Sequence, residues 1–143
     1  MFRKLSDRFY ASPQISVSDV ADASAQGITL IVNNRPDGES DDQTPGGQIE
    51  AAARQAGLDY VAIPVTQAGF SESQVDAMTK ALSEAKGPVL AYCRSGTRST
   101  FLWSLAQASQ GANPQKIAAQ AADAGYDISP VRAMVDMLAA GKE

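Results

Sequence analysis

Histidine is absent from the 143 residues of this chain, and cysteine occurs only once, at Cys93. Without histidine the chain lacks the commonest general base and the commonest metal ligand of proteins. A Cys-His protease and a zinc site built from cysteine and histidine are therefore excluded. A single cysteine leaves no partner for an internal disulfide and no built-in resolving thiol. Proton transfer must use a carboxylate, the substrate or water, and we expect neither a metal nor another cofactor.

Long hydrophobic runs and basic runs are also missing. No stretch approaches the roughly 18 apolar residues of a membrane span, and the charged segment 1–8 lacks the apolar core of a signal peptide. The net charge of −4 and the absence of a basic cluster argue against nucleic acid as the partner. We therefore expect one globular domain over residues 1–143 in the cytoplasm, without a membrane or nucleic-acid partner.

Strand and helix signals alternate along the chain. Strands are expected at 8–12, 28–32, 59–64 and 89–92, and helices at 17–26, 47–56, 72–86, 99–110, 114–124 and 130–140. This alternation predicts an α/β fold with a central, mostly parallel sheet of four to five strands and helices on both faces. The strand 89–92 is apolar on both faces and should be central. The loop 33–46, rich in Gly, Pro, Asp and Asn, is long enough to suggest a functional role.

The lone cysteine lies in a loop that joins the strand 89–92 to the following helix. Ligands of open α/β sheets bind at this end of the strands, where backbone N–H groups and the helix terminus attract anions. Gly96 allows the backbone to wrap around the sulfur, and Arg98 offers a planar fork to an oxyanion. Cys93 and Arg98 are therefore the predicted catalytic residues, with Cys93 a nucleophilic thiolate. The alternative is a buried structural cysteine.

The remaining loop residues are expected to bind the substrate. Arg94 would face either solvent or an anionic substrate, and Ser99 would either donate to the thiolate or cap the helix. Arg35 would line the pocket or pair with the acidic loop that follows it. The predicted substrate-binding residues are Arg94, Ser95, Gly96, Thr97 and Ser99.

The cysteine loop resembles those of two enzyme families. Its letters, Cys-Arg-Ser-Gly-Thr-Arg over 93–98, are similar to the six-residue loop Cys-Arg-Ser-Gly-any-Arg of rhodanese-like sulfurtransferases. Protein tyrosine and dual-specificity phosphatases carry Cys, five residues, Arg, and then Ser or Thr, so this loop is one residue shorter. Tyr92 also stands where those phosphatases usually have histidine.

Over nearly its whole length the chain resembles a bacterial family of small phosphatase-like domains. These occur alone or fused to metallo-β-lactamase-like enzymes named beta-lactamase hydrolase-like proteins. The resemblance includes the Arg-Pro-Asp-Gly-Glu turn at 35–39, and the segments 27–36 and 60–65 look like early strands of dual-specificity phosphatases. It implies a protein tyrosine/dual-specificity phosphatase-like fold and a functional link to a metallo-β-lactamase-like persulfide dioxygenase. Because members carry both phosphatase and sulfur-transferase labels, it leaves the chemistry open.

The two chemistries differ in their need for a general acid. The phosphatases usually place an aspartate soon after the strand that matches 60–65, but here residues 66–70 contain no carboxylate. The candidate acids are then Asp41 and Asp42 of the long loop, where Asp37 and Glu39 also lie, although a solvated acidic loop is the simpler interpretation. A missing acid typically costs about 10²–10⁴ in rate.

Sulfur transfer needs no strong acid when the leaving group is sulfite or a thiolate, and a short loop suits a singly charged persulfide. The sequence therefore favours a sulfurtransferase that acts through a Cys93 persulfide on thiosulfate or a persulfide. The alternative is a phosphatase that acts on a phosphate ester through a Cys93 phosphocysteine. The third hypothesis is a non-catalytic module that binds anions or persulfides.

Overall fold

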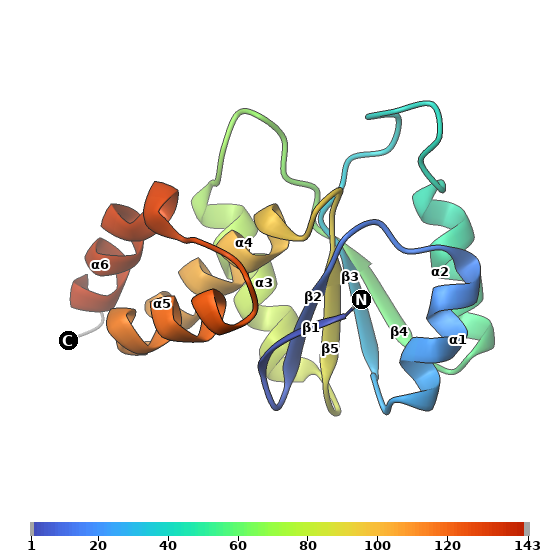
Figure 1. The fold of residues 1–143 in the computed structure, drawn as a ribbon, viewed down its shortest axis with the longest axis horizontal. Coiled ribbons are helices and arrows are strands. Elements are labelled where there is room, and N and C mark those ends of the chain that lie inside the picture. The colour runs from blue at the N-terminus through green and yellow to red at the C-terminus, as the bar shows by residue number, and fades with distance from the viewer. Residues whose placement is uncertain (1, 142–143) are drawn as a thin grey trace.

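The computed structural model describes residues 2–141, which form a five-stranded sheet between two groups of helices (Figure 1). The strands are β1 (Arg3–Ser6), β2 (Phe9–Ser12), β3 (Leu30–Asn33), β4 (Asp59–Ala62) and β5 (Val89–Tyr92). The helices are α1 (Val17–Ala25), α2 (Gly46–Gln55), α3 (Glu72–Glu84), α4 (Thr97–Ser109), α5 (Pro114–Asp123), the 3-10 turn η1 (Ser129–Val131) and α6 (Arg132–Gly141). The expected α/β class, with a mostly parallel sheet and helices on both faces, is confirmed.

The sheet has the strand order β1-β2-β5-β3-β4, with β5 in the middle as the sequence predicts. All pairs are parallel except β1 with β2. Val89 and Ala91 of β5 point into the core under α3 to α6, whereas Leu90 and Tyr92 point into the core under α1 and α2. A strand that is buried on both faces is continuously apolar. For this reason the sequence pattern alone predicts β5.

The edge strand β1 was not expected from the sequence. Three of its four residues are polar, only Leu5 is apolar and buried, and it forms an antiparallel pair with β2 through a tight connection. An edge strand of this kind carries little of the β-branched, apolar signal on which strand prediction depends. The expected helix 130–140 also differs, because it begins with the turn η1 and becomes α-helical only at Arg132.

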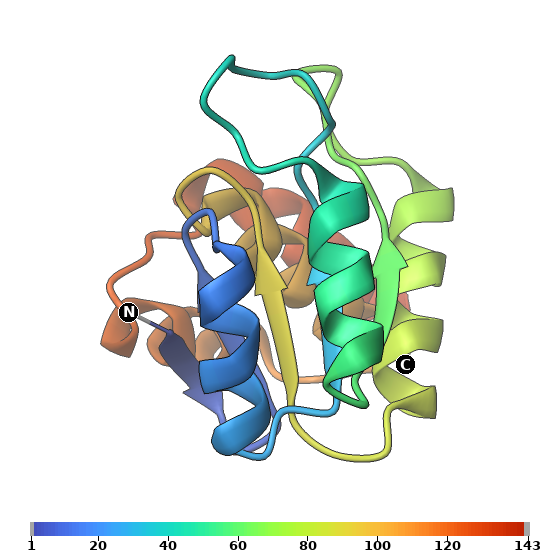
Figure 2. The same ribbon diagram turned by 90° about the vertical axis from the view of Figure 1, so that its right-hand side faces the viewer.

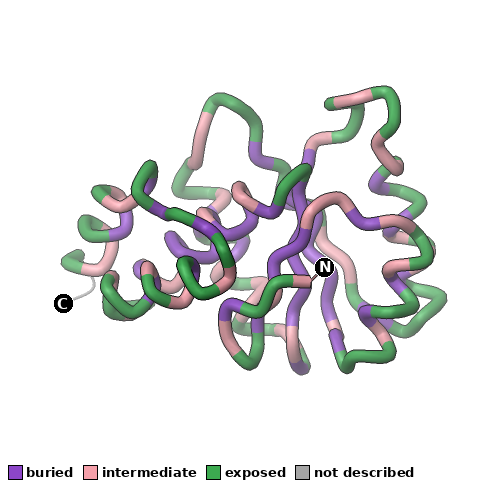
Figure 3. The backbone as a smooth tube through the Cα atoms, viewed as in Figure 1, coloured by how far each residue is buried: buried purple, intermediate pink, exposed green. Residues whose placement is uncertain are grey.

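Helix α4 is the central helix of the fold, buried along most of its length between the sheet and α3, α5 and α6 (Figures 1 and 3). Trp103 and Phe101 are packing residues of this helix. Trp103 stacks on Phe9 of β2 with 5.6 Å between ring centroids, and Phe101 contacts Phe70 edge-on at 6.2 Å. This packing fixes the start of α4 relative to the end of β5, where Cys93 lies.

The carboxyl ends of the parallel strands meet at one end of the molecule. Figure 2 shows the loop after β3, the loop after β4 and the turn after β5 together at that end. Helices α1 and α3 begin with capping boxes, formed by Ser16 with Asp19 and by Ser71 with Gln74. The sequence pattern indicates both capping boxes. Across residues 2–141, no helix is long and apolar enough to cross a membrane.

The buried position of β5 predicts that a cavity at this strand lowers the free energy of unfolding substantially. Leu90 is fully buried, so Leu90→Ala should lower the free energy of unfolding by about 2–5 kcal/mol. Val17→Ala is the control, because Val17 is 46% exposed and should change it by about 0.5 kcal/mol or less. Urea titration followed by circular dichroism measures both. Equal stabilities for the two variants would contradict the central position of β5.

Candidate active site

Cys93 directly follows β5, and its side chain is only 1% exposed. Its Sγ accepts a hydrogen bond from the backbone N–H of Gly96 at 3.1 Å. Gly96 is the N-cap of α4 and has a φ of +92°, in the left-handed region that favours glycine. A Cβ at this position would lie 2.1 Å from the hydroxyl of Tyr126. The sharp turn around the sulfur therefore requires the glycine that the sequence indicates.

Three successive carbonyl groups of the loop are held from outside. The carbonyl of Arg94 accepts from the backbone N–H of Gln14 at 3.2 Å, and that of Ser95 accepts from the hydroxyl of Tyr126 at 3.0 Å. The carbonyl of Gly96 accepts from the backbone and hydroxyl of Thr100. The peptide bonds of residues 2–141 are trans, so the N–H of each of these peptides points to the opposite side. Of these N–H groups, that of Gly96 donates to Sγ of Cys93, and that of Thr97 donates to the hydroxyl of Ser95 at 3.3 Å.

Arg98 lies in the first turn of α4, which begins at Thr97 rather than at the expected Ser99. Its Nη1 and Nη2 donate to the two carboxylate oxygens of Glu39 at 2.6 and 2.9 Å, and Nη1 also donates to the carbonyl of Val65 at 2.8 Å. An arginine has five N–H donors. The Nε–H and one N–H of Nη2, which form the second edge of the guanidinium, donate to no oxygen among the described residues, and Arg98 lies within hydrogen-bonding reach of the Cys93 sulfur. This free edge is a fork that can hold an oxyanion.

The charge state of Glu39 follows from these contacts. The hydrogen bond from Arg98, aided by Arg35 and opposed by burial, lowers the pKa of Glu39 to about 2. The hydrogen bond to Glu39 in turn raises the pKa of Arg98, and Cys93 lies close enough to add to this increase. Glu39 is therefore an anion at neutral pH that has no proton to give.

Arg35 is buried and forms the ion pair with the acidic loop that was one of its two expected roles. Its Nε donates to Glu39 at 2.9 Å, Nη1 donates to the side-chain carbonyl of Gln14 at 3.0 Å, and Nη2 donates to the hydroxyl of Ser40 at 3.1 Å. Glu39 thus lies between Arg35 and Arg98. This three-residue cluster ties the loop after β3 to the cysteine loop.

The candidate acids Asp41 and Asp42 are both exposed on the loop after β3. Asp42 accepts a hydrogen bond from the hydroxyl of Ser40 at 2.6 Å, which lowers its pKa. Among the described residues, no hydrogen bond or ion pair connects Asp41 or Asp42 to the segment 93–98. Their role as acids stays a prediction.

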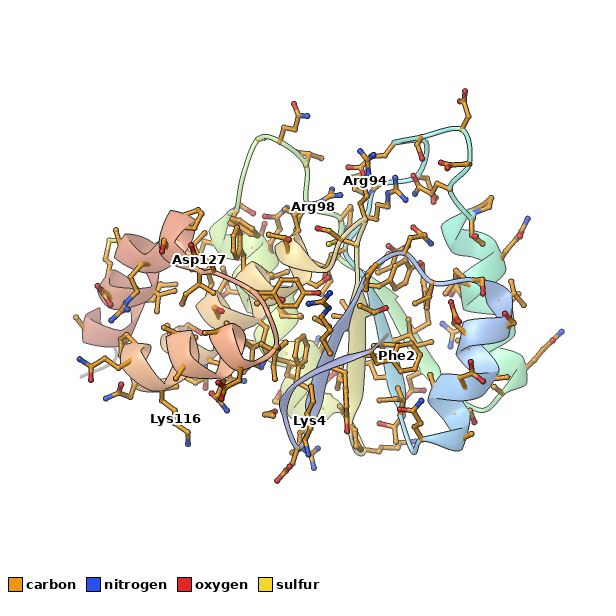
Figure 4. All side chains as sticks on the ribbon, in the orientation of Figure 1. Phe2, Lys4, Arg94, Arg98, Lys116 and Asp127 are labelled. Carbon is orange, nitrogen blue, oxygen red and sulfur yellow. The ribbon has the colours of Figure 1, made fainter. Side chains whose placement is uncertain are left out.

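The other predicted substrate-binding residues surround the cysteine in different ways. Arg94 is exposed and, with Arg98, lines an open pocket of about 480 Å³; Figure 4 shows both side chains at the same end of the molecule. Ser95 and Thr97 hydrogen-bond to each other through their hydroxyls at 2.9 Å. Ser99 is buried, and its hydroxyl has no partner among the described residues. The capping role for Ser99 was wrong, because Gly96 is the cap, whereas its contact with a thiolate stays a prediction.

Several functional contacts were not expected from the sequence. The carbonyl of Val65, the side chain of Gln14 and the hydroxyl of Tyr126 all support the site, yet none belongs to a motif. Tyr126 is 31 positions from the carbonyl that it contacts. Within residues 2–141, no group of three or more His, Cys, Asp or Glu side chains is arranged to hold a metal ion.

The ion pairs of Glu39 predict an acid-sensitive contribution to stability. Its pKa of about 2 lies below the ordinary value of 4.5, so the stabilisation is complete above that ordinary value and is lost as the pH falls towards 2. Glu39→Gln should therefore lower the melting temperature most near neutral pH and progressively less below about pH 4.

The measurement is thermal unfolding of the parent and the variant from neutral to strongly acidic pH. Glu50→Gln is the control for the loss of one carboxylate, because Glu50 pairs with Arg54 on the exposed face of α2. A melting-temperature difference for Glu39→Gln that does not change with pH would show that the carboxylate is not held by the arginines.

Comparisons with known proteins agree on the family. Residues 1–110 match the family described as beta-lactamase hydrolase-like protein, phosphatase-like domain. A beta-lactamase hydrolase-like protein from Agrobacterium fabrum is 38% identical over 108 residues, covering 76% of this chain and 25% of that protein. One from Xylella fastidiosa is 34% identical over 107 residues, covering 75% and 25%. The chain spans about a quarter of the length of the curated relatives it matches.

Solved structures share the fold. A candidate phosphatase from Neisseria meningitidis has a TM-score of 0.83 and 34% identity, covering 95% of this chain and 96% of that one. Pseudomonas aeruginosa TpbA, solved in complex with phosphotyrosine, has a TM-score of 0.68 and 18% identity, covering 99% and 89%. The phosphatase-like fold implied by the resemblance is thus confirmed. Together with the match over residues 1–110, these comparisons show that the chain belongs to the phosphatase-like domain family of beta-lactamase hydrolase-like proteins.

Proposed function

We propose that this domain is a thiol-dependent phosphatase that hydrolyses phosphate monoesters through Cys93. The observation that carries the proposal is the free edge of Arg98 beside a cysteine whose sulfur accepts a backbone N–H. Glu39 occupies one edge of the guanidinium and leaves the other for an oxyanion. The phosphatase-like fold and relatives support this chemistry over the sulfur transfer that the sequence favoured.

The proposed reaction has two steps. The Cys93 thiolate attacks phosphorus, an S–P bond forms, the P–O bond breaks, and the leaving oxygen takes a proton from solvent. Water then attacks phosphorus and loses a proton to the phosphoryl oxygens or to solvent, the S–P bond breaks, and inorganic phosphate leaves with the thiolate restored. The free edge of Arg98 would bind two phosphoryl oxygens and the loop N–H groups would bind the third, where charge develops in the transition state.

Among residues 2–141, no carboxyl group is placed to act as a general acid at Cys93, and this limits the substrate class. Glu39 is held as an anion with a pKa of about 2, and the segment 66–70 contains no carboxylate. The leaving group must therefore be acidic by itself, which favours phenols over aliphatic alcohols. The pocket beside Arg98 is lined by Phe70 and Phe101 and suits an aromatic leaving group. Aryl phosphates are accordingly the proposed substrates.

Sulfur transfer is the second candidate, and the same missing acid favours it. A sulfite or thiolate leaving group needs no proton donor, and the six-residue loop from Cys93 to Arg98 matches the rhodanese-like length. In this case the substrate would be thiosulfate or a persulfide. The link to a metallo-β-lactamase-like persulfide dioxygenase belongs to this candidate and stays a prediction.

The first test separates the two reactions by the adduct on Cys93. We expect p-nitrophenyl phosphate to be hydrolysed and mass spectrometry after rapid acid quenching to show phosphate on Cys93. Cys93→Ser should abolish turnover and keep the native circular dichroism spectrum, because serine lacks the thiolate nucleophile. Ser83→Ala, an exposed change on α3, is the matched control.

Each alternative outcome has a defined meaning. A sulfur adduct from thiosulfate, without phosphate ester hydrolysis, would establish the second candidate instead. Protection of Cys93 from alkylation by phosphate, with neither adduct nor turnover, would indicate a binding module. Substantial turnover by Cys93→Ser would exclude every covalent mechanism.

The second test concerns the general acid. Without a strong acid, the rate for a series of aryl phosphates should rise steeply with the acidity of the phenol. Asp41→Asn and Asp42→Asn should then each keep the parent rate within about twofold, because no hydrogen bond or ion pair among the described residues joins either one to the segment 93–98. A loss of about 10²–10⁴-fold on the least acidic phenols in one variant would instead identify that residue as the acid.

A further inference from the structure

We propose that Tyr126, on the connection between α5 and η1, is a positioning residue that sets the reactivity of Cys93 through the peptide bond between Ser95 and Gly96. The inference rests on the proposed role of Cys93 as a thiolate in an anion-binding loop. It assigns to the helical tail a function in the site, in addition to covering one face of the sheet.

One peptide group links the tyrosine to the sulfur. The hydroxyl of Tyr126 donates to the carbonyl of Ser95 at 3.0 Å, and the N–H of the same peptide, contributed by Gly96, donates to Sγ of Cys93 at 3.1 Å. In a trans peptide the C=O and N–H point in opposite directions. The two hydrogen bonds therefore hold one peptide plane from its two sides.

This arrangement acts on the sulfur in two ways. A hydrogen bond to a peptide carbonyl polarises the group and strengthens its N–H as a donor, which favours negative charge on Cys93. It also fixes orientation, because Gly96 has no Cβ and its peptide rotates more easily than others. If the peptide turned over, the carbonyl oxygen of Ser95 would face the thiolate and repel both it and a bound anion.

Tyr126 is itself held firmly. Gly125 closes α5 with a φ of +94°, and the N–H of Tyr126 donates to the carbonyl of Ala121 at 2.9 Å. The guanidinium of Arg3 lies over the aromatic ring, 5.3 Å from its centroid, and donates to the carbonyl of Ala124 at 3.1 Å. Burial raises the pKa of Tyr126, so its hydroxyl remains a proton donor.

The helical tail, residues 111–141, lies outside the part of the chain that matches the family. Tyr126 lies beyond residues 1–110, the part that matches the family. Figure 1 shows the connection after α5 turning back from the outer helices towards the sheet. The hydroxyl is the only side-chain group among the described residues that reaches the carbonyl of Ser95. Loss of this one contact therefore tests the role of the tail in the site.

The experiment measures the alkylation rate of Cys93 by iodoacetamide at about pH 6 in the full chain, with and without inorganic phosphate. Tyr126→Phe removes only the hydroxyl and keeps the ring under Arg3. We expect the alkylation rate to fall by about three- to tenfold, the size expected for the loss of one hydrogen bond. The phosphate concentration that halves the alkylation rate should rise by a similar factor. Tyr10→Phe is the matched control, because the hydroxyl of Tyr10 has no hydrogen-bond partner among the described residues.

The sign of the change separates positioning from a merely structural role. A structural loss would loosen the loop and expose the sulfur, which is now 1% exposed, so alkylation would become faster. Faster or unchanged alkylation of natively folded Tyr126→Phe would overturn the proposal. If that variant does not fold, Arg3→Ala weakens the support of Tyr126 while retaining the hydroxyl. It should slow alkylation less but in the same direction, and a faster or unchanged rate would again overturn the proposal.

The readout is independent of turnover. Alkylation and its protection by phosphate require only the thiolate and the loop, whereas the proposed phosphatase reaction fails if the parent protein hydrolyses no phosphate ester. A parent without hydrolysis but with slowed alkylation in Tyr126→Phe would remove the proposed reaction and keep the positioning role.

Discussion

The carboxylate of Glu39 between Arg35 and Arg98 is the interaction on which the site depends. Arg35 is almost fully buried, and a buried guanidinium without an anionic partner would be strongly destabilising. The same carboxylate takes the Nη1–Nη2 edge of Arg98 and leaves the Nε–Nη2 edge without an oxygen partner among the described residues. One residue therefore neutralises a buried charge, attaches the loop after β3 to α4, and orients Arg98, the arginine proposed to bind an oxyanion.

This ion-pair cluster also determines which chemistry the site can support. A carboxylate with a pKa of about 2 cannot serve as a proton donor near neutral pH, although it is the acidic group that contacts Arg98. A site of this kind would hold an anion well and would protonate a leaving group poorly. Two reactions need no proton donor for the leaving group: hydrolysis of the phosphate ester of an acidic phenol, and transfer of sulfur from thiosulfate. The fold and the relatives favour the hydrolysis.

The loop around Cys93 depends on supports from several parts of the fold. Gln14, two residues after the end of β2, donates to the carbonyl of Arg94. Thr100 of α4 donates to the carbonyl of Gly96. Tyr126 of the tail holds the carbonyl between them. The central position of β5 makes this possible, because neighbouring segments approach its carboxyl end from both sides. The conformation of the six-residue loop from Cys93 to Arg98 is thus fixed by contacts from three separate segments.

The sequence by itself determined most of the elements and the location of the candidate site. The apolar run 89–92, the capping boxes at Ser16 and Ser71, and the Cys93–Arg98 loop are local patterns, and local periodicity and capping chemistry suffice to interpret them. Only the tertiary structure decided that Glu39 pairs with Arg98, 59 positions away, and that Tyr126 reaches Ser95, 31 positions away. The polar edge strand β1 and the early start of α4 also required it. Such contacts depend on how the helices pack on the sheet. The residue type at one position does not show which residue, distant in the sequence, will pack against it.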